Sequence, residues 1–278
     1  MKNLSLKLVL GFIFSSLILV SCNDDDNKAV NKESISAEEA SAVIEVDDIS
    51  NDVNNVIDDF FEFEEGLSSR SETNKPDFFN CMTASFEVSG TTKTITLDFG
   101  ESCSLPSDNV LSGKIIMSYE LNTEAQEITV TYTYQNFYFN ENGIDGQSTI
   151  VRVKENENGN PQSTLTYDVA VTWSDGEYAS GTGTKIREWV EGFDTRTWED
   201  NVHLITGSWS VTLNDETTYK ATIIEPLRRE MICKYIVSGS LELQKNNVKG
   251  TLDFGDGTCD DIAIFTNESG EESEVTLR

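Results

Sequence analysis

The sequence predicts an all-β protein, an antiparallel meander of about 12 to 13 strands preceded by one amphipathic α-helix. Between residues 36 and 66, apolar side chains recur at steps of three and four, the period of a helix. From about residue 80 onward, apolar and polar residues alternate in short segments such as 128–134, the period of a half-buried strand. Turn dipeptides separate these segments, and no interval has the length of a crossover helix, which disfavours parallel pairing.

The predicted helix carries its own start and stop signals. Ser36 is followed three residues later by Glu39, the spacing of a capping box, and Gly66 is a typical helix end. The apolar stripe consists of Val43, Val46, Ile49, Val53, Val56, Ile57, Phe60 and Phe63. Asp and Glu fill the other face, and we expect the helix to pack on the β domain or to act as a spacer. A partner helix is an alternative, and a membrane surface is least favoured because the polar face would need Lys and Arg.

The strands of the β domain are separated by recognisable turn signals. They include Asn142-Gly143, Asp145-Gly146, Asn158-Gly159, Asp175-Gly176 and Asn246-Asn247. A meander with this rhythm can close as a barrel, stack as a sandwich or form one extended curved sheet. The sequence leaves these three architectures open.

Four of the five cysteines belong to two similar segments. Thr96–Gly100 and Thr251–Gly255 share the sequence Thr-Leu-Asp-Phe-Gly, each shortly before a cysteine. In both cases an earlier cysteine lies across a predicted turn, Asn246-Asn247 in the second. We therefore predict the disulfides Cys81–Cys103 and Cys233–Cys259, each closing its own hairpin. The repeated Asp-Phe-Gly is interpreted as a structural turn, because the other motifs of a protein kinase are missing around it.

The N-terminus has the organisation of a secretory signal. Lys2 and Lys7 precede Leu8–Val20, an apolar run of 13 residues, whereas a bilayer-spanning helix needs about 20. The run ends in Leu19-Val20-Ser21-Cys22, which resembles the lipobox of bacterial lipoproteins, and the resemblance implies cleavage before Cys22 and lipid attachment to it. The acidic cluster Asp24–Asp26 is similar to the surface-export signal of Bacteroidota lipoproteins. The alternative is a soluble secreted protein with an ordinary charged tether.

The chain as a whole resembles uncharacterised surface lipoproteins of the Bacteroidota type. The resemblance rests on residues 19–26 and on the two Leu-Asp-Phe-Gly…Cys segments at 97–103 and 252–259. It implies an outer-membrane lipoprotein, attached to the membrane through Cys22 and either surface-exposed or facing the periplasm. It implies no particular activity.

The sequence thus divides into segments with different expected roles. They are a signal peptide (1–21), an acidic tether (22–35), the helix (36–66), a linker (67–76) and the β domain (77–278). Residues 22–66 contain 15 of the 49 acidic residues and only two lysines. We expect this part to form a solvated stalk that lifts the β domain off a membrane.

Charge and residue counts exclude several functional classes. The chain has 49 acidic and 20 basic residues and a formal net charge of −29, so it would repel a polyanion and nucleic acid is not an expected partner. His203 is the single histidine, which excludes multi-histidine metal centres. No Gly-x-Ser-x-Gly turn accompanies it, so a surface or hydrogen-bonded role is expected. We expect no cofactor and, on balance, no catalytic activity.

Two groups of side chains are candidate contact sites. Exposed aromatic rings suit sugar rings or partner proteins, and the alternative is that they build the core. The candidate ligand-contact residues are Tyr132, Tyr134, Tyr138, Trp173, Trp189, Trp198 and Trp209. Asp253, Asp256 and Asp260 surround a glycine-rich turn and form a weak Ca²⁺ candidate, against the interpretation as a solvated hairpin end.

The functional hypothesis is a non-enzymatic, lipid-anchored envelope protein that binds a glycan or an envelope protein. Two other classes stay open. A carbohydrate-active hydrolase requires two carboxylates that face one cleft, about 5–5.5 Å or about 6.5–9.5 Å apart. A lipocalin-like carrier of an apolar ligand requires a closed barrel with an apolar interior.

Overall fold

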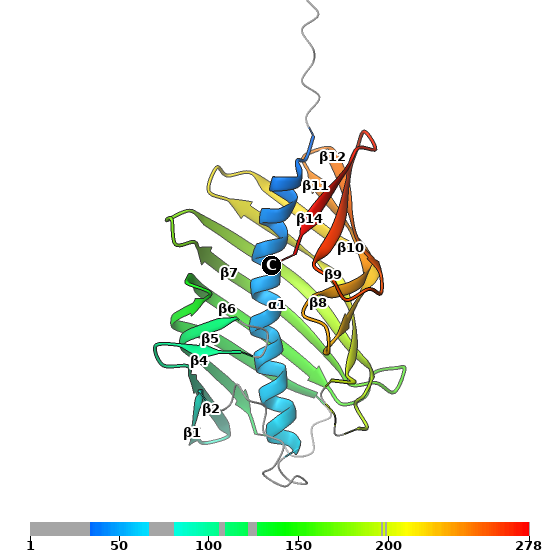
Figure 1. Ribbon diagram of the computed structural model, residues 1–278. Coiled ribbons are helices and arrows are strands. Elements are labelled where there is room, and N and C mark those ends of the chain that lie inside the picture. The colour runs from blue at the N-terminus through cyan, green and yellow to red at the C-terminus, as the bar shows by residue number, and fades with distance from the viewer. Residues whose placement is uncertain are drawn as a thin grey trace, which may run out of the picture. The chain divides into compact units, whose positions relative to one another are not determined.

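The computed structural model describes residues 34–66, 81–105, 109–121, 127–195, 197 and 199–277. The chain divides into two units, Met1–Glu33 and Ser34–Arg278, and all described residues belong to the second. The signal peptide, Cys22 and the acidic cluster therefore lie outside the described residues. Within the second unit, one helix precedes a single large antiparallel sheet (Figure 1).

The helix α1 (Ala37–Gly66) confirms the predicted bounds to within one residue. Its capping box is formed in both directions. The Ser36 backbone N–H donates to Glu39 Oε2 at 2.8 Å, and the Glu39 N–H donates to Ser36 Oγ at 3.2 Å. These two bonds satisfy donors that the first turn of a helix otherwise leaves without partners. No helix among the described residues combines the length and apolarity needed to cross a membrane.

The sheet is an antiparallel meander, as predicted. Its strands are β1 (Thr83–Ser89), β2 (Thr92–Asp98), β3 (Cys103–Ser104), β4 (Val110–Glu120), β5 (Glu127–Phe139), β6 (Asn142–Val153), β7 (Gln162–Thr172), β8 (Tyr178–Glu191), β9 (Val202–Leu213), β10 (Thr218–Glu230), β11 (Ile236–Lys245), β12 (Val248–Asp256), β13 (Ile262–Asn267) and β14 (Glu272–Thr276). They follow one another in sequence order, except that the short β3 pairs only with β4. The sheet of the described residues has 14 strands, against about 12 to 13 predicted, and the two-residue β3 is part of the difference. Strands β1 and β14 lie at the two ends of this order and do not pair with each other, so the sheet is open. Of the three architectures that the sequence left open, the structure has the extended curved sheet and not the barrel or the sandwich.

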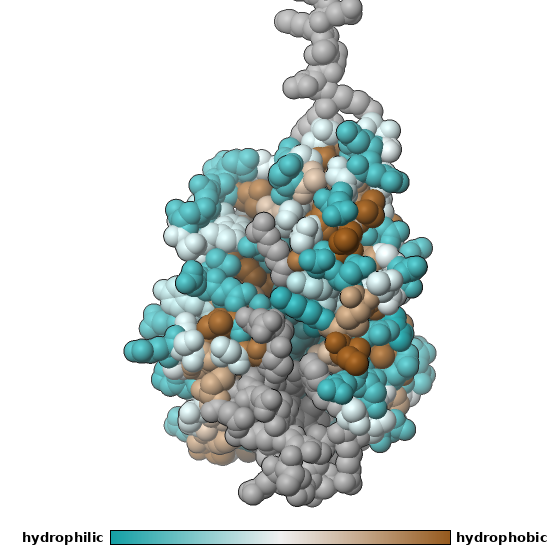
Figure 2. Space-filling model, in the orientation of Figure 1, coloured by the Kyte–Doolittle hydropathy of each residue, from teal (hydrophilic) through white to brown (hydrophobic). Residues whose placement is uncertain are grey.

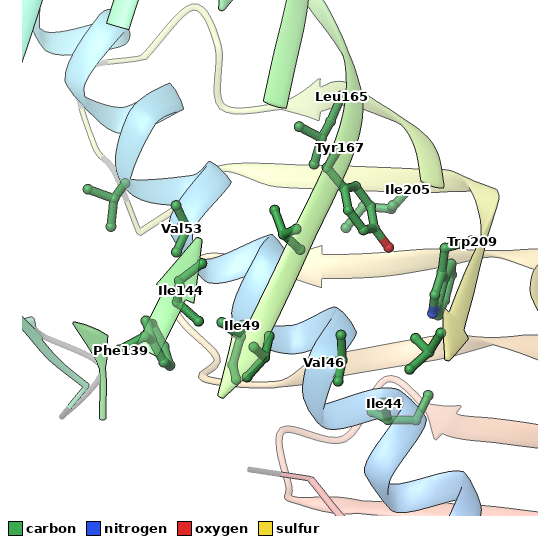
Figure 3. Packing of buried hydrophobic residues seen from close by; sticks show 14 of the residues in the cluster. Ile44, Val46, Ile49, Val53, Phe139, Ile144, Leu165, Tyr167, Ile205 and Trp209 are labelled. Carbon is green, nitrogen blue, oxygen red and sulfur yellow. The ribbon is translucent and has the colours of Figure 1, made fainter. Parts of the chain in front are cut away.

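The core lies between the concave face of this sheet and α1, which crosses the strands (Figure 1). Figure 3 shows stripe residues such as Val46 and Ile49 beside sheet residues such as Ile144 and Tyr167. Burying one such aliphatic side chain stabilises the fold by about 1.5–3 kcal/mol. The close approach depends on Gly181 of β8, where an added Cβ would lie 3.2 Å from Val46 Cγ1.

The position of α1 corrects the expectation of a solvated stalk. The helix shares one compact unit with the sheet, and Val43, Val53 and Ile57 are fully buried. Its acidic residues do not keep it in solvent, because Asp47 and Asp58 are buried against cationic side chains of the sheet. The helical period separates apolar from polar positions in the sequence. It does not show that the polar side chains will contact buried cationic side chains of the sheet.

Both predicted disulfides are present, with Cα–Cα distances of 5.2 Å for Cys81–Cys103 and 5.6 Å for Cys233–Cys259. The second closes the hairpin of β11 and β12, whose last pair before the turn is Lys245 and Val248. This agrees with the turn predicted at Asn246-Asn247. The two covalent links therefore lie near opposite ends of the strand order.

The two copies of the Leu-Asp-Phe-Gly repeat make the same local hydrogen bond. The Gly100 N–H donates to Asp98 Oδ1 at 3.0 Å, and the Gly255 N–H donates to Asp253 Oδ1 at 2.8 Å. The phenylalanine of each copy is buried. The first copy runs past the end of β2 and is a turn, as we interpreted it. The second copy lies inside β12, where the pairing with β11 shifts its register, so the interpretation as a turn is wrong there. In both copies the aspartate caps the following backbone.

Two predicted turns are wrong. The β5–β6 turn is formed by Asn140 and Glu141, with φ of 47° and 70°, rather than by Asn142-Gly143. Asp145-Gly146 lies inside β6. Gly146 has φ of 124°, and a Cβ there would lie 2.2 Å from the Asp168 carbonyl oxygen of the neighbouring strand. This glycine permits a close approach of two strands. An Asp-Gly dipeptide has the same sequence whether its glycine has this role or forms a turn.

Candidate functional site

A band of polar side chains runs between α1 and the sheet, and we call it the polar seam. It consists of Asp47, Asn51, Asn55 and Asp58 of α1 and of Arg152, Ser163, Lys185, Arg187 and His203 of the sheet. The helix residues follow at steps of four, four and three, so they share one side of α1. Lys185 and Arg187 are two residues apart on β8, so they share its concave face.

The first half of the polar seam is the buried ion pair of Asp47 Oδ1 and Lys185 Nζ. Lys185 also donates to Asn51 Oδ1 at 2.8 Å, and the Tyr167 hydroxyl lies 3.4 Å from Asp47 Oδ1. The Lys185 ammonium stands 4.3 Å from the centre of the Trp209 ring. Burial raises the pKa of Asp47 and lowers the pKa of Lys185, and each partner's charge opposes the shift of the other.

The second half is organised around Asp58, whose two carboxylate oxygens contact two arginines. Arg152 Nη1 lies 2.6 Å from Oδ1, and Arg187 Nη1 lies 3.3 Å from Oδ2. Ser163 Oγ and Asn54 Nδ2 also donate to Oδ2, at 3.3 and 3.2 Å. The carboxylate joins α1 to β6, β7 and β8, so this half of the polar seam fixes the helix to three strands.

His203 on β9 is buried beside Arg187, whose Nη2 lies 3.2 Å from Nδ1 and 3.1 Å from Nε2. Its ring stacks on Trp189 with centroids 5.6 Å apart. Burial, followed by the positive charges of Arg187 and Arg229, lowers the pKa of His203. The imidazole is therefore neutral at physiological pH and accepts a hydrogen bond, in line with the hydrogen-bonded role that we expected.

Two small cavities border α1. The first, of about 40 Å³, is lined by Asp58, Arg152, Val153, Pro161, Gln162, Ser163, Arg187, Trp189 and His203. The second, also of about 40 Å³, is lined by Asp48 and Asp52 of α1 with Arg229 and Lys234 of the sheet side, among others. Burial and the neighbouring carboxylates of Asp47 and Asp52 raise the pKa of Asp48 well above its usual value. Each cavity has room for a few water molecules, since one needs about 10–15 Å³ by this measure.

The weak Ca²⁺ candidate lies on an open depression of about 470 Å³ beside β12, β13 and β14. Each carboxylate is engaged with its own turn: Asp253 with Gly255 N–H, Asp256 with Thr258 Oγ1 and Asp260 with Ile262 N–H. Among the residues that the structure describes, no group of three or more His, Cys, Asp and Glu is placed to hold a metal ion. The geometry is that of a solvated hairpin end.

The predicted aromatic contact residues do not form one exposed platform. Tyr132 and Trp209 are buried in the core, and Tyr134 packs against it. The half-buried Trp173 donates its Nε1–H to Glu45 Oε1 at 3.1 Å. These four rings therefore serve the core and the helix–sheet contact, because apolar rings gain most where they leave water.

The remaining candidate rings have three different outcomes. Tyr138 is 46 % exposed on β5 and stays available for a contact. Trp189 lines the first cavity. Trp198 lies outside the described residues.

The sequence reasoning missed the charged residues of the polar seam. Lys185 and Arg187 continue the inward face of β8 that begins with Ala179, Gly181 and Gly183. The available signal for these inward-facing charges was their spacing of two along the strand. The other face of the same strand is rich in Thr and Ser. No family model, curated protein or solved structure matches the chain, so its function is argued from its own residues.

Proposed function

We propose that the protein is a lipid-anchored envelope protein with a non-enzymatic binding or interaction role at the outer membrane or cell surface. The observation that carries this proposal is the tetrad Leu19–Cys22, placed at the end of a 13-residue apolar run as in a lipobox. The two disulfides support the same compartment, because such bonds persist in oxidising environments.

The use of the charged groups supports binding over catalysis. Asp47, Asp58, Lys185 and Arg187 hold the helix on the sheet, and His203 is neutral beside them. For hydrolase chemistry, two carboxylates must face one cleft. Asp58 is the single carboxylate among the described residues that line the first cavity, and it already contacts two arginines. Asp48 and Asp52 both line the second cavity, but its volume of about 40 Å³ leaves no room for a sugar ring. The aspartates along the open depression are each bonded within their own local segment.

Strand β1 supports an interaction role because it ends the open sheet. End strands can pair with a strand of a partner. Phe86 and Val88 on β1 are 49 % and 58 % exposed. Elsewhere, the coloured part of the face in Figure 2 is mainly hydrophilic, with hydrophobic residues in small separate groups. The observations favour a partner protein that recognises a strand edge over one that needs a broad apolar face.

The lipocalin-like alternative does not meet its structural condition. It requires a closed barrel around an apolar ligand, and this sheet is open with α1 packed on its concave face. The interior is occupied by the chain itself. We therefore do not retain this alternative.

Metabolic labelling with an alkyne fatty acid tests the anchor in the full-length chain. We expect label on the wild type and none on Cys22→Ser, while Asp24→Asn/Asp25→Asn/Asp26→Asn keeps the label. A wild-type chain that is secreted without label would overturn the proposal. Protease treatment of intact cells then gives the orientation, and the triple Asp→Asn variant should lose surface digestion if the acidic cluster directs export.

A further inference from the structure

The first cavity of the polar seam has a chemical character that the helix–sheet contact does not explain. Its polar lining comes from five elements: Asp58 of α1, Arg152 of β6, Ser163 of β7, Arg187 and Trp189 of β8, and His203 of β9. Most of these side chains are buried. This polar cavity is partly open to solvent, and it holds water or a ligand, because empty cavities in proteins are apolar.

Two buried N–H groups of the lining residues have no hydrogen-bond partner in the structure, Arg187 Nε and Trp189 Nε1. Both nitrogens can only donate. Buried donors without acceptors are rare in folded proteins and costly. A group that satisfies these two donors has to be an acceptor, which water or an anion supplies.

The charge of Arg187 indicates what kind of acceptor fits. Its side chain is 8 % exposed, and within the described part of the chain its ion pair is with Asp58, at 3.3 Å, while Arg152 holds the same carboxylate at 2.6 Å. Its other partners are uncharged: Asn55 Oδ1 at 2.7 Å, the ring of His203 and the sulfur of Met231 at 3.8 Å. A buried cation with a shared, longer ion pair is stabilised more by an anion than by water.

We propose that this cavity binds one small monovalent anion, a halide or a carboxylate of formate size, with Arg187 and Trp189 as its donors. A volume of about 40 Å³ admits such an ion and excludes a sugar or a lipid chain. A guanidinium suits a carboxylate because it donates two parallel N–H groups. The site is independent of the lipid anchor, so its test does not depend on that proposal.

The test uses the folded chain from residue 23 onward, with both disulfides intact, in sodium gluconate, whose anion is too large for the cavity. Chloride replaces gluconate at constant ionic strength while ³⁵Cl NMR linewidth and thermal unfolding are followed. We expect a saturable rise in Tm and a broadened chloride resonance that sharpens when formate is added. A change that rises linearly without saturation would refute a site.

Two tryptophan variants make the test specific. Trp189→Phe keeps a ring beside His203 and removes one donor, so chloride affinity should fall about tenfold or more, as expected for a hydrogen bond to a charged group. Trp173→Phe is the matched control, because it removes an indole N–H that is bonded to Glu45 outside the cavity. The control should keep wild-type affinity. Equal chloride affinity in Trp189→Phe and the wild type would show that chloride binds without the Trp189 donor and would overturn the proposal.

Arg187 itself is tested by Arg187→Lys, which keeps a positive charge and loses the Nε donor. We expect weakened chloride binding and a lost preference for formate over chloride. If this variant does not fold, the comparison of the two tryptophan variants still decides the proposal.

Discussion

Replacing Lys185 by methionine should lower the free energy of unfolding by about 3–5 kcal/mol, the usual cost of leaving one partner of a buried ion pair alone. Asp47 and Lys185 are each 3 % exposed. Without Lys185, Asp47 keeps only neutral partners, Asn51 Nδ2 at 3.0 Å and the Tyr167 hydroxyl at 3.4 Å. Methionine fills nearly the same volume, so the loss reports the unpaired charge and not a cavity.

The double variant Asp47→Asn/Lys185→Met should recover most of this loss, to within about 1–2 kcal/mol of the wild type, because no buried charge remains. The deficit of Lys185→Met should also shrink in acid. Burial already raises the pKa of Asp47, and removing the ammonium raises it further, so the lone carboxyl takes up a proton as the pH falls. The stability penalty is full above that raised pKa, declines as the pH falls through it, and vanishes below the ordinary aspartate pKa of 3.8, where the unfolded chain is protonated as well.

Urea unfolding followed by tryptophan fluorescence measures these differences, with an unchanged m-value as the check that the same surface unfolds. The four proteins of the cycle give the coupling energy directly. A loss below about 1 kcal/mol for Lys185→Met would refute the argument that this pair holds α1 on the sheet. A double variant less stable than either single variant would refute it as well.

Three further outcomes are expected. Ser36→Ala should lower the free energy of unfolding by about 1 kcal/mol, because the Glu39 N–H loses its acceptor; an unchanged urea midpoint would contradict this. Cys233→Ser/Cys259→Ser should cost about 3 kcal/mol in urea unfolding, from its closed loop, and equal midpoints would exclude a stabilising link. Asp48→Asn should raise Tm at neutral pH but not below pH 3.8. The reason is that burial raises the pKa of Asp48, so ionising this carboxyl costs the folded state stability as the pH rises. An equal gain in Tm at both pH values would contradict this.

Local signals allowed much of the fold to be predicted. Ser36 and Glu39 define the helix start because a capping box acts within one turn, and the structure forms both of its bonds. The disulfide pairs follow from a short repeat that flanks a hairpin, so the partners are close in sequence. Closure of the sheet was not predictable, because it depends on the summed twist of many strands.

The ion pairs of the polar seam were not predictable from local patterns, although the inward positions of Lys185 and Arg187 on β8 left a signal in the sequence. Asp47 and Lys185 are 138 residues apart, and a helix period assigns any aspartate to the outer face. The hydrophobic pattern of α1 correctly identified the buried stripe from Val43 to Phe60, and the side chain of Phe63 lies outside the described residues. The pattern could not show that the sheet also contacts acidic side chains of the helix. Long-range ion pairs of this kind become visible only when the strand order is known.

The distance in sequence between α1 and its partners also constrains the order of folding. The helix is the first described element of the chain, while its ion-pair partners Arg152 and Lys245 follow Asp58 and Glu39 by 94 and 206 residues. The docking of α1 therefore includes contacts with a high loop-closure cost, and these contacts form only when β6 and β11, which carry Arg152 and Lys245, are in place.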